Sequence, residues 1–219
     1  MIKRLFILVF FTCAGVFTFA QRINTFETWF SAAVQVKSND FAFTAEEGWR
    51  VREFYLSRQT YTDLNFGYKL NKAFNISAGY RLILKPHLFS ISESNSRFYT
   101  DATFTHDAGE LDFSARIRLQ YTTLGQEDDF DLPSETYFRN KLRARYKIND
   151  IISIAAGYEM LLILAPGLNI INENRFSVEA QLKLNKHNAL SIGYAVRNYI
   201  QVEDPLNVHV IGIDYVYKL

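Results

Sequence analysis

Residues 111–121 read Leu-Asp-Phe-Ser-Ala-Arg-Ile-Arg-Leu-Gln-Tyr, a strict alternation of apolar and polar side chains. As a β-strand this segment has one wholly apolar face, and its other face carries Asp112, Ser114, Arg116, Arg118 and Gln120. A helix would mix the two sets around its surface. The same division recurs along the chain. We therefore predict an all-β fold, a single up-and-down antiparallel transmembrane β-barrel with lipid against its outer face and a polar lumen.

The composition is consistent with one domain of this kind. The chain has 219 residues and no Pro-, Ser- or Gly-rich linker, so we expect one barrel domain over residues 21–219. It contains 19 Phe and 13 Tyr, yet its mean hydropathy is only −0.08. Aromatic girdles around a polar interior would give this combination, although the strands of a soluble β protein also favour aromatic residues.

Residues 1–20 are typical of a secretory signal peptide. Lys3 and Arg4 precede an apolar run over residues 5–11, and the small residues Thr18 and Ala20 precede the expected cleavage site. The only cysteine, Cys13, lies in this leader, so the exported chain would hold no disulfide. Loss of the leader would leave 22 basic against 23 acidic side chains, a balance that argues against a nucleic-acid partner.

No run of 18 apolar residues follows residue 20, so a chain that spans a membrane must do so as a closed barrel. Alternating segments recur at about 25–37, 41–55, 63–70, 75–85, 97–104, 138–146, 152–162, 175–184, 190–197 and 210–219. With residues 111–121 they number about eleven. Because a single-chain bacterial barrel has an even number of strands, we expect ten or twelve, with twelve favoured.

The connections alternate in length. Short polar turns are expected at 71–72, 106–110, 149–150 and 185–188, and longer connections at 86–95, 124–134, 165–172 and 202–205. This alternation is typical of barrels in the outer membrane of Gram-negative cells, whose longer loops face outward. The last strand places Ile211, Ile213, Tyr215, Tyr217 and Leu219 on one face. It is similar to the terminal signal that the barrel-assembly machinery recognises, with Leu219 in place of the usual aromatic residue.

Several features together resemble one family, domain of unknown function 2490. They are Trp29, Arg50 with Arg52, the Gly-Tyr pairs at residues 67–68, 79–80 and 157–158, the segment Arg-Asn-Lys-Leu at 139–142, and Arg175 with Phe176. The resemblance implies an outer-membrane barrel and assigns no catalytic residue.

Inward-facing arginines are the main candidate for a binding site. Arg97, Arg139 and Arg175 follow the longer connections, and Arg143 and Arg145 lie lower on the same face. Such guanidinium groups could bind a small anionic solute or a lipid head group. The alternative is a structural ladder of salt bridges with the inward acids, which buried charges favour. These acids are Asp101, Asp112, Glu135, Glu159, Glu179 and Asp214.

Motifs of catalysis are scarce. The pair His87 and Ser90 is the one combination that could serve a lipid-modifying enzyme. The acidic run at 127–131 lacks the spacing of a calcium loop, and we expect no metal and no cofactor. The leading hypothesis is a non-enzymatic outer-membrane protein, acting as a narrow pore, a small-ligand site or a membrane-structural protein. The alternatives are the lipid-modifying enzyme and a secreted, soluble, lipocalin-like carrier with an apolar cavity.

Overall fold

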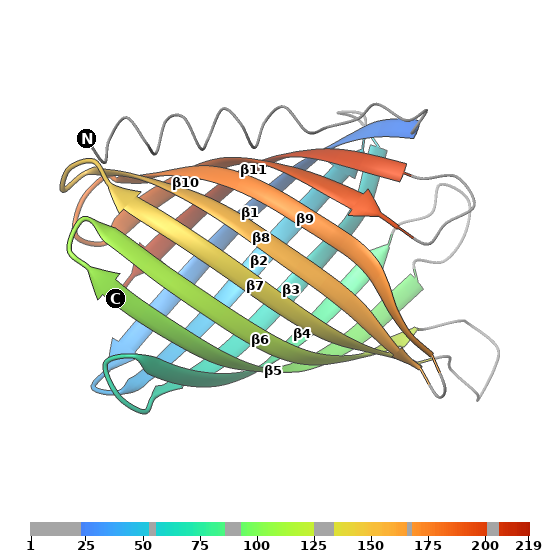
Figure 1. Ribbon diagram of the computed structural model, residues 1–219, viewed down its shortest axis with the longest axis horizontal. Coiled ribbons are helices and arrows are strands. Elements are labelled where there is room, and N and C mark those ends of the chain that lie inside the picture. The colour runs from blue at the N-terminus through green and yellow to red at the C-terminus, as the bar shows by residue number, and fades with distance from the viewer. Residues whose placement is uncertain (1–22, 53–55, 86–92, 125–133, 166–167, 201–205) are drawn as a thin grey trace.

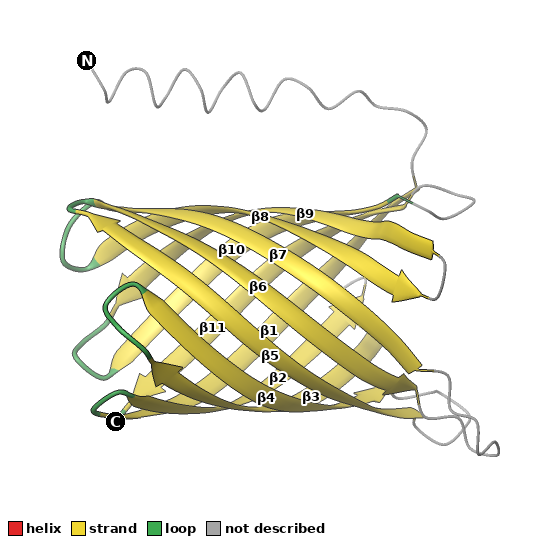
Figure 2. Ribbon diagram, turned by 60° about the horizontal axis from the view of Figure 1, so that its bottom comes forward, coloured by secondary structure: helices red, strands yellow, loops and turns green. Residues whose placement is uncertain are grey.

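The computed structural model describes residues 23–52, 56–85, 93–124, 134–165, 168–200 and 206–219, which form a closed barrel (Figure 1, Figure 2). The all-β prediction is confirmed. The described residues contain eleven strands: β1 (Ile23–Ser38), β2 (Phe41–Arg52), β3 (Leu56–Lys69), β4 (Phe74–Lys85), β5 (Glu93–Ala108), β6 (Leu111–Leu124), β7 (Ser134–Lys147), β8 (Ile152–Ala165), β9 (Leu168–Lys183), β10 (Asn188–Tyr199) and β11 (Leu206–Lys218). No helix of the described part of the chain has the length and hydropathy needed to span a membrane.

The expectation of ten or twelve strands is wrong, because the barrel closes through a parallel pair. Consecutive strands pair antiparallel, but β1 and β11 run side by side in the same direction, from the pair Ile23 and Leu206 to the pair Gln35 and Lys218. A parallel ladder also joins the amide and carbonyl groups of both strands. Backbone hydrogen bonding therefore does not require an even strand number, and the count of eleven alternating segments in the sequence needed no adjustment.

One end of the barrel, which we call the turn end, carries five tight connections at residues 39–40, 70–73, 109–110, 148–151 and 184–187 (Figure 1, left). Asn39 and Gly109 adopt positive φ, at 52° and 80°. The side chains of Asn71, Asn149 and Asn185 each accept hydrogen bonds from the backbone N–H groups two and three residues later. These asparagine turns end one strand and start the next.

At the opposite end, the loop end, one predicted connection is too long. Residues 165–172 were expected to form a loop, but β8 extends to Ala165 and β9 begins at Leu168, with these two residues paired. A bulge between Leu161 and Leu162 takes up the irregularity in the pairing. The other connections of this end lie largely outside the described residues, as does the predicted signal peptide.

The assignment of the two faces is confirmed. Phe113, Ile117 and Leu119 point outward and are 45–50% exposed, whereas Asp112, Arg118 and Gln120 are buried in the lumen. A lipocalin-like carrier would need the reverse arrangement, with the apolar side chains lining its cavity. The charged lumen contradicts that alternative.

The strands are strongly staggered. The stagger is seen when paired residues are followed from strand to strand around the barrel, starting at Ser38 of β1. The path returns to β1 at Asn24 and not at Ser38. Such a stagger requires strands that are tilted against the barrel axis, as Figure 2 shows. Residues near the ends of β2 and β10 and residues in the first half of β9 can therefore meet in the lumen.

Two inward glycines make room for tyrosine rings. The Tyr61 ring lies where a Cβ atom of Gly48 would be, and the Tyr99 ring lies in the same way against Gly79. The Tyr61 hydroxyl donates to Glu46 at 2.6 Å, and the Tyr99 hydroxyl donates to Asp63 at 2.7 Å. The glycines thus let two aromatic rings lie flat on the lumen wall beside its charged groups.

Candidate functional site: the charged lumen

A cavity of about 570 Å³ lies inside the barrel and is lined mainly by charged side chains. Nine basic residues contribute to its wall, against five acidic ones, so the lining has a net positive charge. The basic residues are Arg50, Arg81, Arg97, Arg116, Arg118, Arg139, Lys141, Arg175 and Arg197; the acidic residues are Glu46, Asp63, Asp101, Glu159 and Glu173.

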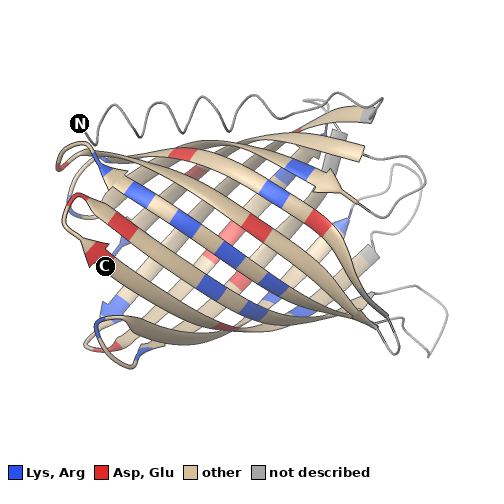
Figure 3. Cartoon of the chain, viewed as in Figure 1, with Lys and Arg blue, Asp and Glu red and all other residues tan. Residues whose placement is uncertain are grey.

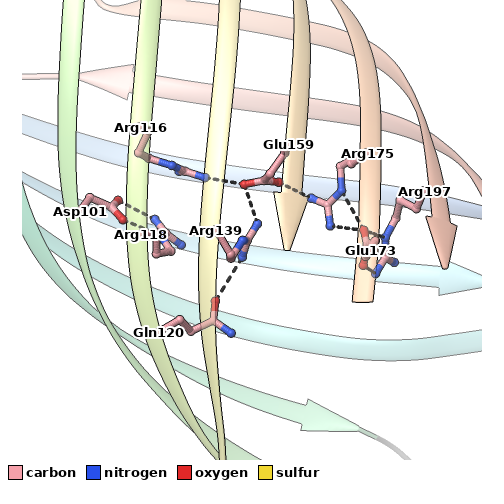
Figure 4. Close-up of polar contacts among 9 residues, drawn as sticks. All are labelled: Asp101, Arg116, Arg118, Gln120, Arg139, Glu159, Glu173, Arg175 and Arg197. Carbon is pink, nitrogen blue, oxygen red and sulfur yellow. Dashed lines mark hydrogen bonds and ion pairs between the residues drawn. The ribbon is translucent and has the colours of Figure 1, made fainter. Parts of the chain in front are cut away.

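Glu159 lies at the centre of an ion-pair network (Figure 4). Its carboxylate accepts from Arg116 at 2.8 Å and Arg139 at 3.0 Å, and its second oxygen lies 3.3 Å from Arg175. Glu173 extends the network, because it pairs with Arg175 at 2.9 Å and with Arg197 at 2.7 Å. These contacts join the neighbouring strands β6, β7, β8, β9 and β10 along one wall of the lumen.

A second set of ion pairs lies on the neighbouring part of the wall. Arg118 binds both oxygens of Asp101, at 2.6 and 2.7 Å. Arg81 donates to Asp63 at 2.6 Å. Most of the charge in the cavity is therefore paired, as buried charge generally is.

The arginines singled out in the sequence lie in this lumen, in different surroundings. Arg139 and Arg175 belong to the Glu159 network. Arg143 pairs with Glu179 at 2.9 Å, and Arg145 pairs with Asp112. Arg97 lines the cavity and, among the described residues, donates to the Thr122 hydroxyl alone, at 3.3 Å.

The acids predicted to face the lumen fall into two groups, according to whether they contact an arginine or a hydroxyl group. Asp101, Asp112, Glu159 and Glu179 each contact an arginine. In contrast, Asp214 accepts a hydrogen bond from Ser31 at 2.6 Å, and Glu135 accepts one from Tyr137. The lumen thus combines a salt-bridge ladder with basic groups that the ladder does not neutralise.

Three cations of the cavity wall have no carboxylate partner among the described residues. They are Arg50, Arg97 and Lys141. Arg97 was identifiable as a candidate from the sequence, whereas Arg50 and Lys141 were not singled out. Both were recognisable as inward residues by their alternation, and only the stagger of the strands shows that they face the same cavity.

Strand β7 carries a row of positive charge along the lumen. Its successive inward positions from the cavity to the turn end are all basic, as the row of blue segments in Figure 3 shows. We call this set the β7 row: Arg139, Lys141, Arg143, Arg145 and Lys147. At the turn end, Lys147 lies 3.1 Å from Asp112 and 3.6 Å from Asp107.

Lysines also gather at the turn end. Every strand that runs toward this end, except β5, places an inward lysine within its last two residues. These are Lys37, Lys69, Lys147, Lys183 and Lys218. The turn-end mouth of the lumen is therefore basic, and the β7 row joins it to the cavity.

The family model described as protein of unknown function (DUF2490) matches residues 26–207. The chain belongs to this family. The match begins in β1, runs through every strand between, and ends at the start of β11. No curated protein matches the sequence closely enough to count as a relative.

The candidate catalytic pair of this DUF2490 chain is not among the described residues, and the described histidines His187 and His209 do not line the cavity. His87, Ser90 and the acidic run at 127–131 lie outside the described residues. His209 is on the outer face, where its Nδ1 is 2.6 Å from the Tyr194 hydroxyl. His187 lies in a turn beside the carbonyl oxygen of Lys218. In the described ranges, no three His, Cys, Asp or Glu residues gather as a metal site.

Proposed function

We propose that this DUF2490 protein is an outer-membrane β-barrel that forms a narrow, anion-selective pore. The observation that carries the proposal is the β7 row, with its five consecutive inward basic residues between the turn-end mouth and the cavity. Carboxylates of neighbouring strands pair with four residues of the row, but the cavity wall keeps nine basic residues against five acidic ones. A wall with a net positive charge attracts anions and repels cations along a narrow path.

The membrane location is supported by the outer surface. Large apolar side chains are exposed there on every strand, among them Phe30, Trp49, Phe66, Ile117 and Leu142. Soluble monomers rarely expose apolar surface on this scale. The strands have 12 to 16 residues, which exceeds the roughly 9–11 residues that a tilted strand needs to cross the hydrocarbon core.

Orientation follows from the two ends of the barrel. The short turns of outer-membrane barrels face the periplasm, so the lysine-lined mouth would open on the periplasmic side. The proposal therefore gives the pore a basic periplasmic entrance and a cavity above it.

Two measurements test the location and the activity separately. Fractionation of cells and heat-modifiable gel mobility test the membrane barrel; a soluble protein without heat-modifiable mobility overturns the location. Reversal potentials in planar bilayers under a salt gradient test the pore. We expect anion selectivity, and cation selectivity or the absence of conductance overturns the activity.

Variants of the β7 row sharpen the second test. The double variant Arg143→Gln, Lys147→Gln removes two positive charges from the row and is expected to shift the reversal potential toward that of a non-selective pore. Lys186→Gln, in an exposed turn outside the strands, removes a positive charge away from the lumen wall and serves as the control. An equal shift in both variants would show that the row does not determine selectivity.

A further inference from the structure

Arg50 of β2 stacks on aromatic rings of the lumen wall. Its guanidinium carbon lies 4.0 Å from the centre of the Trp29 ring and 5.6 Å from that of Tyr61. Its Nε atom is buried and has no hydrogen-bond partner. No carboxylate in the described part of the chain forms an ion pair with it.

Other guanidinium groups surround the same two rings. Arg175 and Arg197 each lie 5.3 Å from the centre of Trp29, and Arg81 lies 4.0 Å from that of Tyr61. We call Arg50, Arg81, Arg175 and Arg197, with the two rings, the Arg50 cluster. Four positive charges thus lie around two neighbouring aromatic side chains.

Within the described ranges, Arg50 is the one member of the cluster that forms no ion pair with a carboxylate. Arg81 pairs with Asp63 at 2.6 Å, Arg175 with Glu173 at 2.9 Å, and Arg197 with Glu173 at 2.7 Å. Stacking on Trp29 supplies part of the stabilisation that Arg50 needs, but a cation–π contact is worth only about 0.5–2 kcal/mol. An unpaired buried charge costs several kcal/mol. The geometry therefore leaves a demand for a negative charge beside Arg50.

From this we infer that the Arg50 cluster is a discrete binding site for a small oxyanion that carries two or more negative charges. The inference rests on the proposed function, because the ligand reaches the site through the anion-selective lumen. Arg97 and Lys141 line the same cavity without a carboxylate partner among the described residues, so the described part of the wall holds three cations that form no ion pair. A multiply charged oxyanion satisfies several such groups at once, and its oxygens match the planar donor set of arginine.

The test uses inorganic phosphate as the probe and the full-length exported barrel in detergent micelles. Isothermal titration at constant ionic strength is expected to show saturable binding of phosphate, and a large excess of chloride should not displace it. Arg50→Gln is expected to weaken phosphate binding by roughly tenfold or more, the loss typical of a charge-assisted hydrogen bond.

Arg52→Gln is the matched control. Arg52 occupies the next inward position of β2 and also has a buried Nε atom without a hydrogen-bond partner, but it does not line the cavity. This variant therefore makes the same change of charge on the same strand, away from the cavity. Phosphate affinity should change by less than about threefold, well below the effect of losing a direct charged contact. Arg50→Lys keeps the charge and loses the planar group over Trp29, so an intermediate loss is expected. If Arg50→Gln does not fold, Arg50→Lys is compared with Arg52→Gln in its place.

Two results overturn the site: wild-type protein that binds no phosphate in a saturable manner, and equal losses in Arg50→Gln and Arg52→Gln. The second result would mean that only the overall charge of the lumen matters. Failure of the proposed pore is distinguishable, because saturable phosphate binding without conductance would refute the pore and leave the site intact.

Discussion

Replacement of Glu159 by glutamine tests the physics of the lumen most directly. Glu159 is 4% exposed and is the only carboxylate in the described ranges that pairs with Arg116 and with Arg139; Arg175 retains Glu173. Glu159→Gln removes the negative charge and keeps the shape and one acceptor oxygen. Two guanidinium groups, which are 25% and 11% exposed, would then lose their counter-ion.

The expected loss of stability follows from these contacts. Removing one partner of a buried ion pair costs about 3–5 kcal/mol. We expect about 3 kcal/mol, the lower end of that range, because the remaining oxygen of glutamine still accepts one hydrogen bond and the cavity admits water. Glu179→Gln is the control, because Glu179 and its partner Arg143 are 32% and 29% exposed. A pair so accessible to water contributes less than about 1 kcal/mol.

The assay is equilibrium unfolding by urea in lipid vesicles, with the bilayer measurement of selectivity alongside. Glu159→Gln changes the cavity wall from five acidic residues to four against nine basic ones, so selectivity for anions should rise while stability falls. Equal loss of stability in Glu159→Gln and Glu179→Gln, or a loss below about 1 kcal/mol in Glu159→Gln, would refute the argument that Glu159 neutralises the lumen.

Three further predictions concern the wall of the barrel. Ile117→Arg, on the outer face in the middle of β6, should cost about 2–4 kcal/mol of stability in lipid vesicles; an unchanged unfolding midpoint would mean that this face does not contact hydrocarbon. Gly79→Ala should cost about 1–3 kcal/mol because its Cβ atom meets the Tyr99 ring, whereas Gly67→Ala, whose nearest neighbour would be 3.7 Å away, should cost less in the same unfolding assay. Cysteines at Val34 and Tyr217, which are paired in the parallel closure, should cross-link with a short bifunctional reagent. Cysteines at Val34 and His209 should not, and the opposite pattern would contradict the parallel pairing.

The fold was predictable from the sequence because each strand carries its own signal. Alternation in a segment such as 111–121 depends only on which side chains face lipid and which face the lumen, and a strand shows this without reference to its partners. The strand number was misjudged for the opposite reason. Whether the number of strands is even or odd depends on how the whole barrel closes. Nothing within β1 or β11 alone shows that the two strands run parallel.

The binding site was only partly predictable for a related reason. The sequence identified Arg97, Arg139 and Arg175 because they follow the longer connections, but it did not single out Arg50. Arg50 lies in β2, far along the chain from Arg175 and Arg197. Arg50 lies opposite Trp29 in the β1–β2 pair, but only the stagger of the strands brings Arg175 and Arg197 to the same ring, and stagger is set by pairing around the whole ring.

The Arg50 cluster also lies at the seam where the barrel closes. Trp29 belongs to β1, and its indole N–H donates to Glu27 of the same strand at 2.8 Å. Arg197 of β10 reaches Glu27 at 3.7 Å, and Ser31 of β1 donates to Asp214 of β11 at 2.6 Å. Polar contacts in the lumen therefore join the strands on both sides of the parallel pair. An anion held by Arg50, Arg175 and Arg197 would connect β2, β9 and β10 across this seam. A ligand that binds only the folded state stabilises that state by mass action, so occupancy of the cluster and closure of the barrel would be thermodynamically coupled.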